Sequence, residues 1–151
     1  MESIRKQNPL LALMNYTQGY GGSPVIGIGN KNDTAAVNAM LASKIARDIL
    51  PSDLILRWTV KAIDEKQTMY QLIALKAGKG GKAPLGGDVI TDARDDFDKI
   101  QGSVVSMTMN AEGAKVWEQL TRDNIGNAIA NVLDNQVYSF PNVNPAFSGG
   151  S

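Results

Sequence analysis

Hydrophobic and polar residues alternate clearly at the start of the segment formed by residues 104–143. Val105, Met107 and Met109 alternate with a serine and a threonine, which is the two-residue period of a strand with one buried face. Asn110 follows directly and can accept a hydrogen bond from a free amide at the start of a helix. Apolar residues then recur at helical spacing. The pattern predicts a strand that leads into a helix.

Other residues of this segment mark where its elements begin and end. Glu112 falls in the first helical turn, where a carboxylate stabilises the positive end of the helix dipole. Gly126 suits the left-handed conformation just beyond a helix end. Asp134 and Asn135 tolerate the positive φ angles that a two-residue hairpin turn requires, and Pro141 ends the last strand or confines it to an edge. The segment is therefore predicted to form a strand, a helix and a hairpin.

The spacing of apolar residues earlier in the chain predicts a helix over residues 33–49. Asp33 suits its N-cap, and the apolar stripe of this helix extends to Ile45 and Ile49. Pro51 ends the helix because proline lacks the amide hydrogen that the helix needs.

A two-faced strand follows that helix. Arg57, Thr59 and Lys61 alternate with apolar residues, and we expect their face to stay in contact with water. Trp58 lies on the opposite face. A second tryptophan, Trp117, belongs to the apolar stripe of the later helix, and we expect both tryptophans in the core.

Together these patterns predict an α+β fold, with a mostly antiparallel sheet and two main helices packed on one face. The strands are expected near residues 25–29, 54–63, 69–76, 103–109, 128–133 and 136–140, and the helices near residues 33–49 and 111–123. Residues 1–24 are expected to form a flexible N-terminal segment, residues 25–143 one domain and residues 144–151 a frayed tail. Glycine-rich stretches at 19–24 and 77–87 are predicted to be flexible loops.

The composition is that of an ordinary globular domain. The 151 residues suit one domain. Lys plus Arg and Asp plus Glu each number 15, so the balanced charge gives no long-range attraction to nucleic acid, and no nucleic-acid partner is expected. The absence of Cys and His removes thiol nucleophiles, imidazole bases and the usual zinc ligands. We therefore expect a protein that is not an enzyme and has no cofactor or metal site.

Four carboxylates cluster at Asp92, Asp95, Asp96 and Asp98. Such a cluster could hold a hard cation or take part in acid–base chemistry. Alternation along a strand, however, sends neighbouring side chains to opposite faces. Charged side chains also discourage the addition of another strand at a sheet edge, and we interpret the cluster as solvated surface.

Methionines and aromatic residues form the other candidate site. Thioether side chains fill irregular gaps in a core, and they also suit apolar surfaces that accept many partners. Core packing is the ordinary explanation. The functional alternative is a groove that takes unfolded polypeptide, with Met107, Met109, Tyr138 and Phe140 as candidate contacts. A stand-alone ligand-binding module with a closed pocket, or an unrecognised enzyme with a polar cleft, remains an alternative.

Several separated motifs resemble the head subdomain of the first periplasmic domain of the SecD and SecDF family, membrane components of bacterial protein export. The motifs are MNAEGAKVW (109–117), TRDNIG (121–126), VLD (132–134) and VYSFP (137–141), preceded by PLGGDVITDAR (84–94). They follow the family's order and spacing. Asn131 stands where the family usually has an apolar residue, and Asn135 where it usually has glycine.

The resemblance implies that the motif residues mainly specify the fold. These residues are Asp88, Asp92, Asn110, Glu112, Gly113, Thr121, Asn124, Gly126, Asp134 and Pro141. It also implies a role in late protein translocation on the periplasmic side of the inner membrane, driven by the proton gradient. The implied partners are unfolded preprotein, the rest of SecD and SecF, and the SecYEG channel.

The resemblance also changes how the absence of membrane signals is interpreted. No apolar run approaches the roughly 18 residues of a membrane span, and no signal peptide is evident. The family couples to the proton gradient through transmembrane helices. We therefore expect this chain to be a piece from between such helices, in contact with the membrane only through segments that it does not contain.

Overall fold

The protein is described from a computed structural model, in which residues 7–17 and 22–144 are placed. In chain order the elements are α2 (Pro9–Leu13), β1 (Met14–Tyr16), β2 (Val25–Asn30), α3 (Thr34–Leu41), α4 (Lys44–Ile49), β3 (Leu54–Trp58), β4 (Met69–Lys76), η2 (Lys79–Gly81), η3 (Gly87–Val89), β5 (Ile90–Asp98), β6 (Gly102–Met109), α5 (Ala111–Asp123), β7 (Asn131–Leu133) and β8 (Gln136–Ser139). Half of the loop predicted at 19–24 and nearly all of the tail predicted at 144–151 lie outside the described residues.

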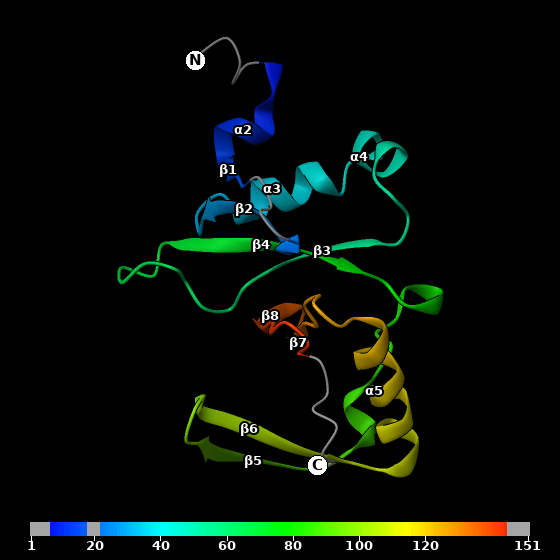
Figure 1. Ribbon diagram of the computed structural model, residues 1–151. Helices are drawn as coiled ribbons and strands as arrows, with labels where there is room; N and C mark the ends of the chain where they lie inside the picture. The colour runs from blue at the N-terminus through cyan, green and yellow to red at the C-terminus, as the bar shows by residue number, and fades with distance from the viewer. Residues whose placement is uncertain (1–6, 18–21, 145–151) are drawn as a thin grey trace.

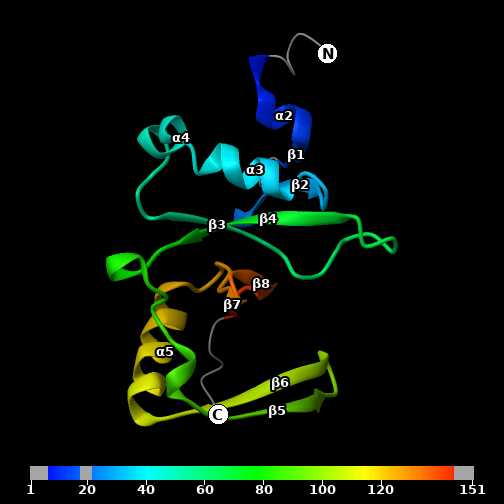
Figure 2. The ribbon, with the colours of Figure 1, turned by 180° about the vertical axis from the view of Figure 1, so that it is seen from behind.

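The α+β class is confirmed, but the strands form three sheets instead of one. The largest has the order β1-β2-β4-β3, while β5 pairs with β6 and β7 pairs with β8. All these pairs are antiparallel. Figures 1 and 2 show α3 and α4 on one side of the four-stranded sheet, and α5 with the two smaller sheets on the other. The two main helices therefore lie on opposite sides, because the chain crosses the plane of the large sheet after β4.

Strand β4 of the four-stranded sheet is buried on both faces. Leu72 and Ile73 are neighbours on β4, and their side chains are 1% and 0% exposed. Leu72 belongs to a core with Val37 of α3 and Trp58, whereas Ile73 belongs to a second core with Val137 of β8. Since successive side chains of a strand point to opposite faces of its sheet, β4 joins the two cores.

The N-terminal segment contributes to the first of these cores. We expected residues 1–24 to be flexible, but β1 pairs with β2 as an edge strand of the sheet. Met14 is only 4% exposed, and α2 packs against β1 and α3. Packing therefore orders the apolar run that includes Met14, although a glycine-rich stretch follows it.

The helix predicted over residues 33–49 is two helices. Ser43 has an extended backbone, and its hydroxyl accepts a hydrogen bond of 3.2 Å from the Ala46 amide. A serine at such a position caps a new helix, so α4 turns away from α3. The predicted apolar stripe is consequently wrong in α4, where Ile45 and Ile49 are 74% and 76% exposed.

The strand predicted over 54–63 ends at Trp58, and the expected wet face is wrong at Thr59. That side chain is 5% exposed. Its hydroxyl donates to the Lys61 carbonyl at 3.0 Å and accepts from the Gln71 amide at 3.1 Å. Backbone partners thus satisfy the buried hydroxyl, which removes the cost of taking it out of water. Trp58 is in the core as predicted, and its indole N–H donates to Asn38.

The turn before β4 is organised by Asp64. Its carboxylate accepts hydrogen bonds from the Thr68 hydroxyl at 2.6 Å and from the Met69 amide at 2.7 Å. These bonds stabilise the ionised form, so the Thr68 hydroxyl, followed by the Met69 amide, lowers the pKa of Asp64 below its ordinary value.

The β5–β6 ribbon lies apart from the large sheet, at the opposite end of the molecule from α2 (Figure 1). Its two strands pair antiparallel, with Ala93 opposite Met107. The predicted buried face is wrong, since Val105 is 68% exposed and Met107 is 42% exposed. The alternation of apolar and polar residues correctly indicated a strand. No described element, however, covers the apolar face of this strand at Val105.

Candidate functional site

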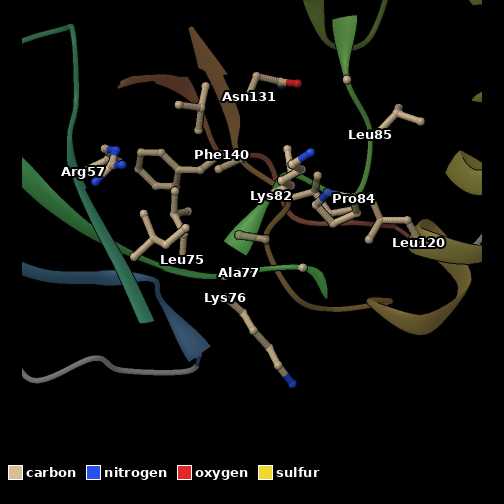
Figure 3. A pocket seen from close by; sticks show the side chains of 18 of the residues that line it. Arg57, Leu75, Lys76, Ala77, Lys82, Pro84, Leu85, Leu120, Asn131 and Phe140 are labelled. Atoms are coloured by element: carbon tan, nitrogen blue, oxygen red, sulfur yellow. The ribbon is translucent and has the colours of Figure 1, made fainter. Parts of the chain in front are cut away.

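An open cleft of about 610 Å³ lies between the large sheet and the C-terminal half of the chain. Its walls come from β3 and β4 (Ile55, Arg57, Ile73, Leu75), the connection to β5 (Lys82, Pro84, Leu85), β6 (Met107, Met109), α5 with its C-cap (Trp117, Leu120, Asn124) and the chain around β7 and β8 (Ile129, Ala130, Val132, Phe140). Figure 3 shows side chains of these elements gathered around the cleft. Its floor includes the second core, because Ile73 belongs to both.

Three of the four predicted apolar contacts line this cleft. Met107 and Met109 come from β6, and Phe140 directly follows β8. Phe140 is half-buried because it also packs against the second core. Tyr138 is 52% exposed and is not among the cleft residues. The topology therefore brings together the two methionines and the phenylalanine but not the tyrosine, and their role in binding stays a prediction.

Trp117 is a wall of the cleft and not a core residue. Its side chain is half-buried, and the residue of α5 that is fully buried is Gly113. Leu120 and Asn124 follow it on the same side of the helix and also line the cleft. The apolar stripe of α5 was recognised in the sequence, but a stripe does not reveal whether it meets a packed core or an open space.

The start of α5 is fixed by two motif residues. The side chain of Asn110 accepts a hydrogen bond of 2.8 Å from the Gly113 amide, which confirms the predicted cap. Gly113 lies against η3, where a Cβ atom added to it would be 2.6 Å from Cβ of Val89. Only glycine allows this approach, so the motif brings α5 close to the connection that borders the cleft.

The end of α5 is fixed by two further motif residues, Thr121 and Asn124. The Thr121 hydroxyl donates to the Trp117 carbonyl at 2.8 Å, and the Asn124 side-chain amide donates to the Leu120 carbonyl at 2.8 Å. The Asn124 bond satisfies a carbonyl of the last helical turn, which lacks a partner within the helix. Gly126 then adopts a φ of 81° just beyond the helix, as predicted.

The hairpin after α5 has the predicted turn. Asp134 and Asn135 have φ angles of 49° and 62°, which is the pattern of a type I′ turn. β8 ends at Ser139, and the Pro141 carbonyl accepts from the Ile129 amide at 3.0 Å. This bond holds the hairpin together at its open end, next to the cleft.

The remaining motif residues are carboxylates on the surface. Glu112 lies in the first turn of α5, as predicted, and Asp88 lies in η3. Asp92 is exposed on β5, where the other three members of its cluster are also exposed. Asp98 accepts from the Gln101 and Ile100 amides, and these two bonds lower the pKa of its carboxyl.

The described residues contain no group of three or more acidic side chains that could hold a metal ion. The two carboxylates whose pKa is shifted, Asp64 and Asp98, are not among the residues of the cleft. What the cleft offers is apolar surface with a few polar groups, notably Arg57, Lys82 and Asn131. Such a surface binds by contact and desolvation.

Sequence reasoning missed several cleft residues. Arg57 was placed on a wet face, and Leu75 and Leu85 were not singled out, although all three line the cleft. Leu85 could have been suspected, because it is the apolar residue in a glycine-rich connection. Arg57 carries no such signal in the sequence.

Comparison with known proteins identifies the family that the chain resembles. The family model described as the SecDF P1 head subdomain matches residues 61–151. The protein translocase subunit SecD of Rhodothermus marinus is 42% identical over 149 residues, which cover 97% of this chain and 23% of the relative. The protein translocase subunit SecDF of Thermus thermophilus is 44% identical over 70 residues, or 46% of this chain and 10% of that protein.

A solved structure of SecDF, described as a membrane component that enhances protein export, is 26% identical to the chain with a TM-score of 0.40. It is matched over 99% of this chain and 59% of that one. The chain spans about a quarter of the length of the Rhodothermus SecD relative. In the described residues, no helix has the length and apolar character needed to cross a membrane.

The match to the Rhodothermus relative also covers the N-terminal third, which the motifs did not reach. The family model covers more than half of the chain, including every motif between residues 84 and 141. The chain therefore belongs to the SecD and SecDF family of protein translocase subunits, and residues 61–151 correspond to its P1 head subdomain.

Proposed function

We propose that this chain serves a protein translocase from the periplasmic side of the inner membrane by holding a segment of emerging, unfolded preprotein in the cleft. Family membership supports the translocase role. The observation that carries the holding role is the cleft itself, which is open, about 610 Å³ in volume and mostly apolar. An unfolded chain exposes the apolar side chains that such a surface can bury.

The shape and composition of the walls suit a partner of variable sequence. Met107 and Met109 line one side with flexible, polarisable thioethers, which adapt to different side chains. Trp117 and Phe140 add large aromatic surfaces. Few polar groups converge in the cleft, so it lacks the set of directional contacts by which a small-molecule pocket selects one ligand.

The chain would perform this task as one part of a larger assembly. It spans about a quarter of the Rhodothermus SecD relative. We assign the coupling to the proton gradient to membrane-spanning segments of the full-length protein, together with contacts to SecF and the SecYEG channel. The task assigned to this chain is to bind and release polypeptide, with no covalent chemistry.

A titration with a permanently unfolded polypeptide tests the proposal. Trp117 lines the cleft while Trp58 is buried, so a Trp58→Phe background makes the emission report on the cleft. Binding should be saturable, and Leu85→Ser should weaken it, because Leu85 lines the cleft from a loop.

Ile100→Ser is the matched control. Ile100 is 95% exposed at the tip of the β5–β6 ribbon and is not a cleft residue. The control should bind as the parent does. Absence of saturable binding at high micromolar concentration, or equal weakening by both substitutions, would contradict binding in the cleft.

A further inference from the structure

The charged side chains around the cleft all carry the same sign. Arg57, Lys76 and Lys82 line it, and no Asp or Glu among the described residues does. This one-sidedness is local, because the whole chain has 15 basic and 15 acidic residues. Figure 3 shows Lys76 extending away from the other labelled side chains. Arg57 and Lys82 are therefore the cations closest to the apolar walls.

Arg57 is placed to receive a negative charge. It is half-buried on β3, and its Nη1 donates to the Leu56 carbonyl at 2.9 Å. A guanidinium has five N–H donors, and this is its single hydrogen bond within the described part of the chain. The two ion pairs found there, Lys44 with Asp48 and Arg122 with Glu118, do not include it.

A half-withdrawn cation beside apolar side chains lacks part of its hydration and is stabilised by a carboxylate partner. The planar guanidinium binds both oxygens of a carboxylate at once, and the bond to the Leu56 carbonyl restricts its orientation. In Figure 3, Arg57 and Phe140 lie in the same part of the cleft. One ligand can therefore meet a charge and an apolar wall together.

We infer that the cleft prefers apolar polypeptide segments that carry an acidic side chain, with the carboxylate bound by Arg57. This inference rests on the proposed function and adds a rule of selection to it. Apolar neighbours of the acidic residue contact Met107 and Phe140, which line the same cleft. Lys82 adds positive potential, so segments with a lysine or arginine at this position are disfavoured by repulsion.

Three synthetic peptides test this preference. They share one extended apolar sequence and differ only at the central residue, which is Glu, Gln or Lys. The 151-residue chain is titrated with each, and tryptophan emission is followed. The Glu peptide should bind about tenfold more tightly than the Gln peptide, as a charge-assisted hydrogen bond allows, and the Lys peptide should bind most weakly.

Substitutions at two arginines locate the preference. Arg57→Gln should abolish the difference between the Glu and Gln peptides, whereas Arg57→Lys, which keeps the charge but not the planar donors, should retain part of it. Arg47→Gln makes the same change of net charge on α4, outside the cleft, and should keep the full difference. Circular dichroism of each variant checks that the fold is intact.

The outcomes separate the two proposals. Binding of all three peptides with equal affinity overturns the acidic preference and leaves polypeptide holding in place. Binding of none overturns the holding function itself. Equal loss of the preference in Arg57→Gln and Arg47→Gln assigns it to overall charge and overturns the role of Arg57.

Discussion

Replacing Gly113 with alanine tests how closely α5 approaches η3. In an unobstructed helix this change is favourable, because alanine is better than glycine by about 1 kcal/mol. Here the added Cβ would lie 2.6 Å from both Cβ and Cγ2 of Val89, and 3.3 Å from Oδ1 of Asn110. The gain in helix propensity raises the free energy of unfolding, whereas the steric cost of the added methyl group lowers it. The sign of the net change depends on which effect is larger.

The packing term is the larger one. Cβ of Val89 is attached to the backbone and cannot rotate away, and a β-branched side chain has few rotamers to choose from. Relief requires α5 and η3 to separate by several tenths of an ångström. Forced insertion of a methyl group into packed structure costs about 1–3 kcal/mol. After subtracting the helix gain, we expect Gly113→Ala to lower the free energy of unfolding by up to about 2 kcal/mol.

Urea unfolding followed by circular dichroism measures this loss. Gly87→Ala is the matched control, since Gly87 lies in the same η3 but an added Cβ has nothing within 4 Å. That control should be neutral or slightly stabilising. A rise of about 1 kcal/mol for Gly113→Ala, as expected of an exposed helix position, would refute the close contact between α5 and η3.

Four further substitutions test other parts of the structure. The lowered pKa of Asp64 means that its hydrogen bonds with Thr68 stabilise the fold fully above the unfolded pKa of about 3.9, and that this stabilisation is lost as pH falls through the lower folded pKa. Unfolding curves between pH 2 and 6 should therefore show Asp64→Asn differing most from the parent above about pH 4, and a difference independent of pH would be inconsistent with this. Trp58→Ala should cost about 3–5 kcal/mol as a core truncation and Trp117→Ala clearly less, because Trp117 is half-buried, so equal losses in melting experiments would place Trp117 in the core. Asn135→Gly should raise the unfolding free energy by up to about 1 kcal/mol, because glycine adopts a φ of 62° without steric cost, and a lower melting temperature would argue against the type I′ turn.

Features that depend on neighbouring residues in the chain were predicted well. The cap at Asn110 and the turn at Asp134 follow from short-range hydrogen bonding and backbone preference. The α5 helix was predicted with its observed length for the same reason. Ser43 shows the limit of this approach, because a serine inside an apolar-periodic stretch gives no local sign that it starts a second helix.

Features that depend on what packs against an element were predicted less well. Val105 alternates as a buried residue would, yet it is 68% exposed, because the face of a ribbon is buried only where another element covers it. Trp117 and Arg57 became cleft residues through the packing of distant segments. Three of the four apolar candidates, Met107, Met109 and Phe140, were recognised by residue type and line the cleft, whereas the cationic side chains of the cleft required the three-dimensional arrangement.

The burial of β4 on both faces has a consequence for how the molecule opens. Leu72 and Ile73 place adjacent residues of one strand in different cores, so a fluctuation that releases β4 disrupts both at once. The large sheet with its two cores should therefore open as one cooperative unit, and the amides of β4 should be among the last to exchange with deuterium. The β5–β6 ribbon, whose β5 is largely exposed throughout, should exchange earlier and without the rest. Hydrogen exchange would then divide the chain into a slow unit around β4 and a fast ribbon, although β4 and β5 are consecutive strands of the chain.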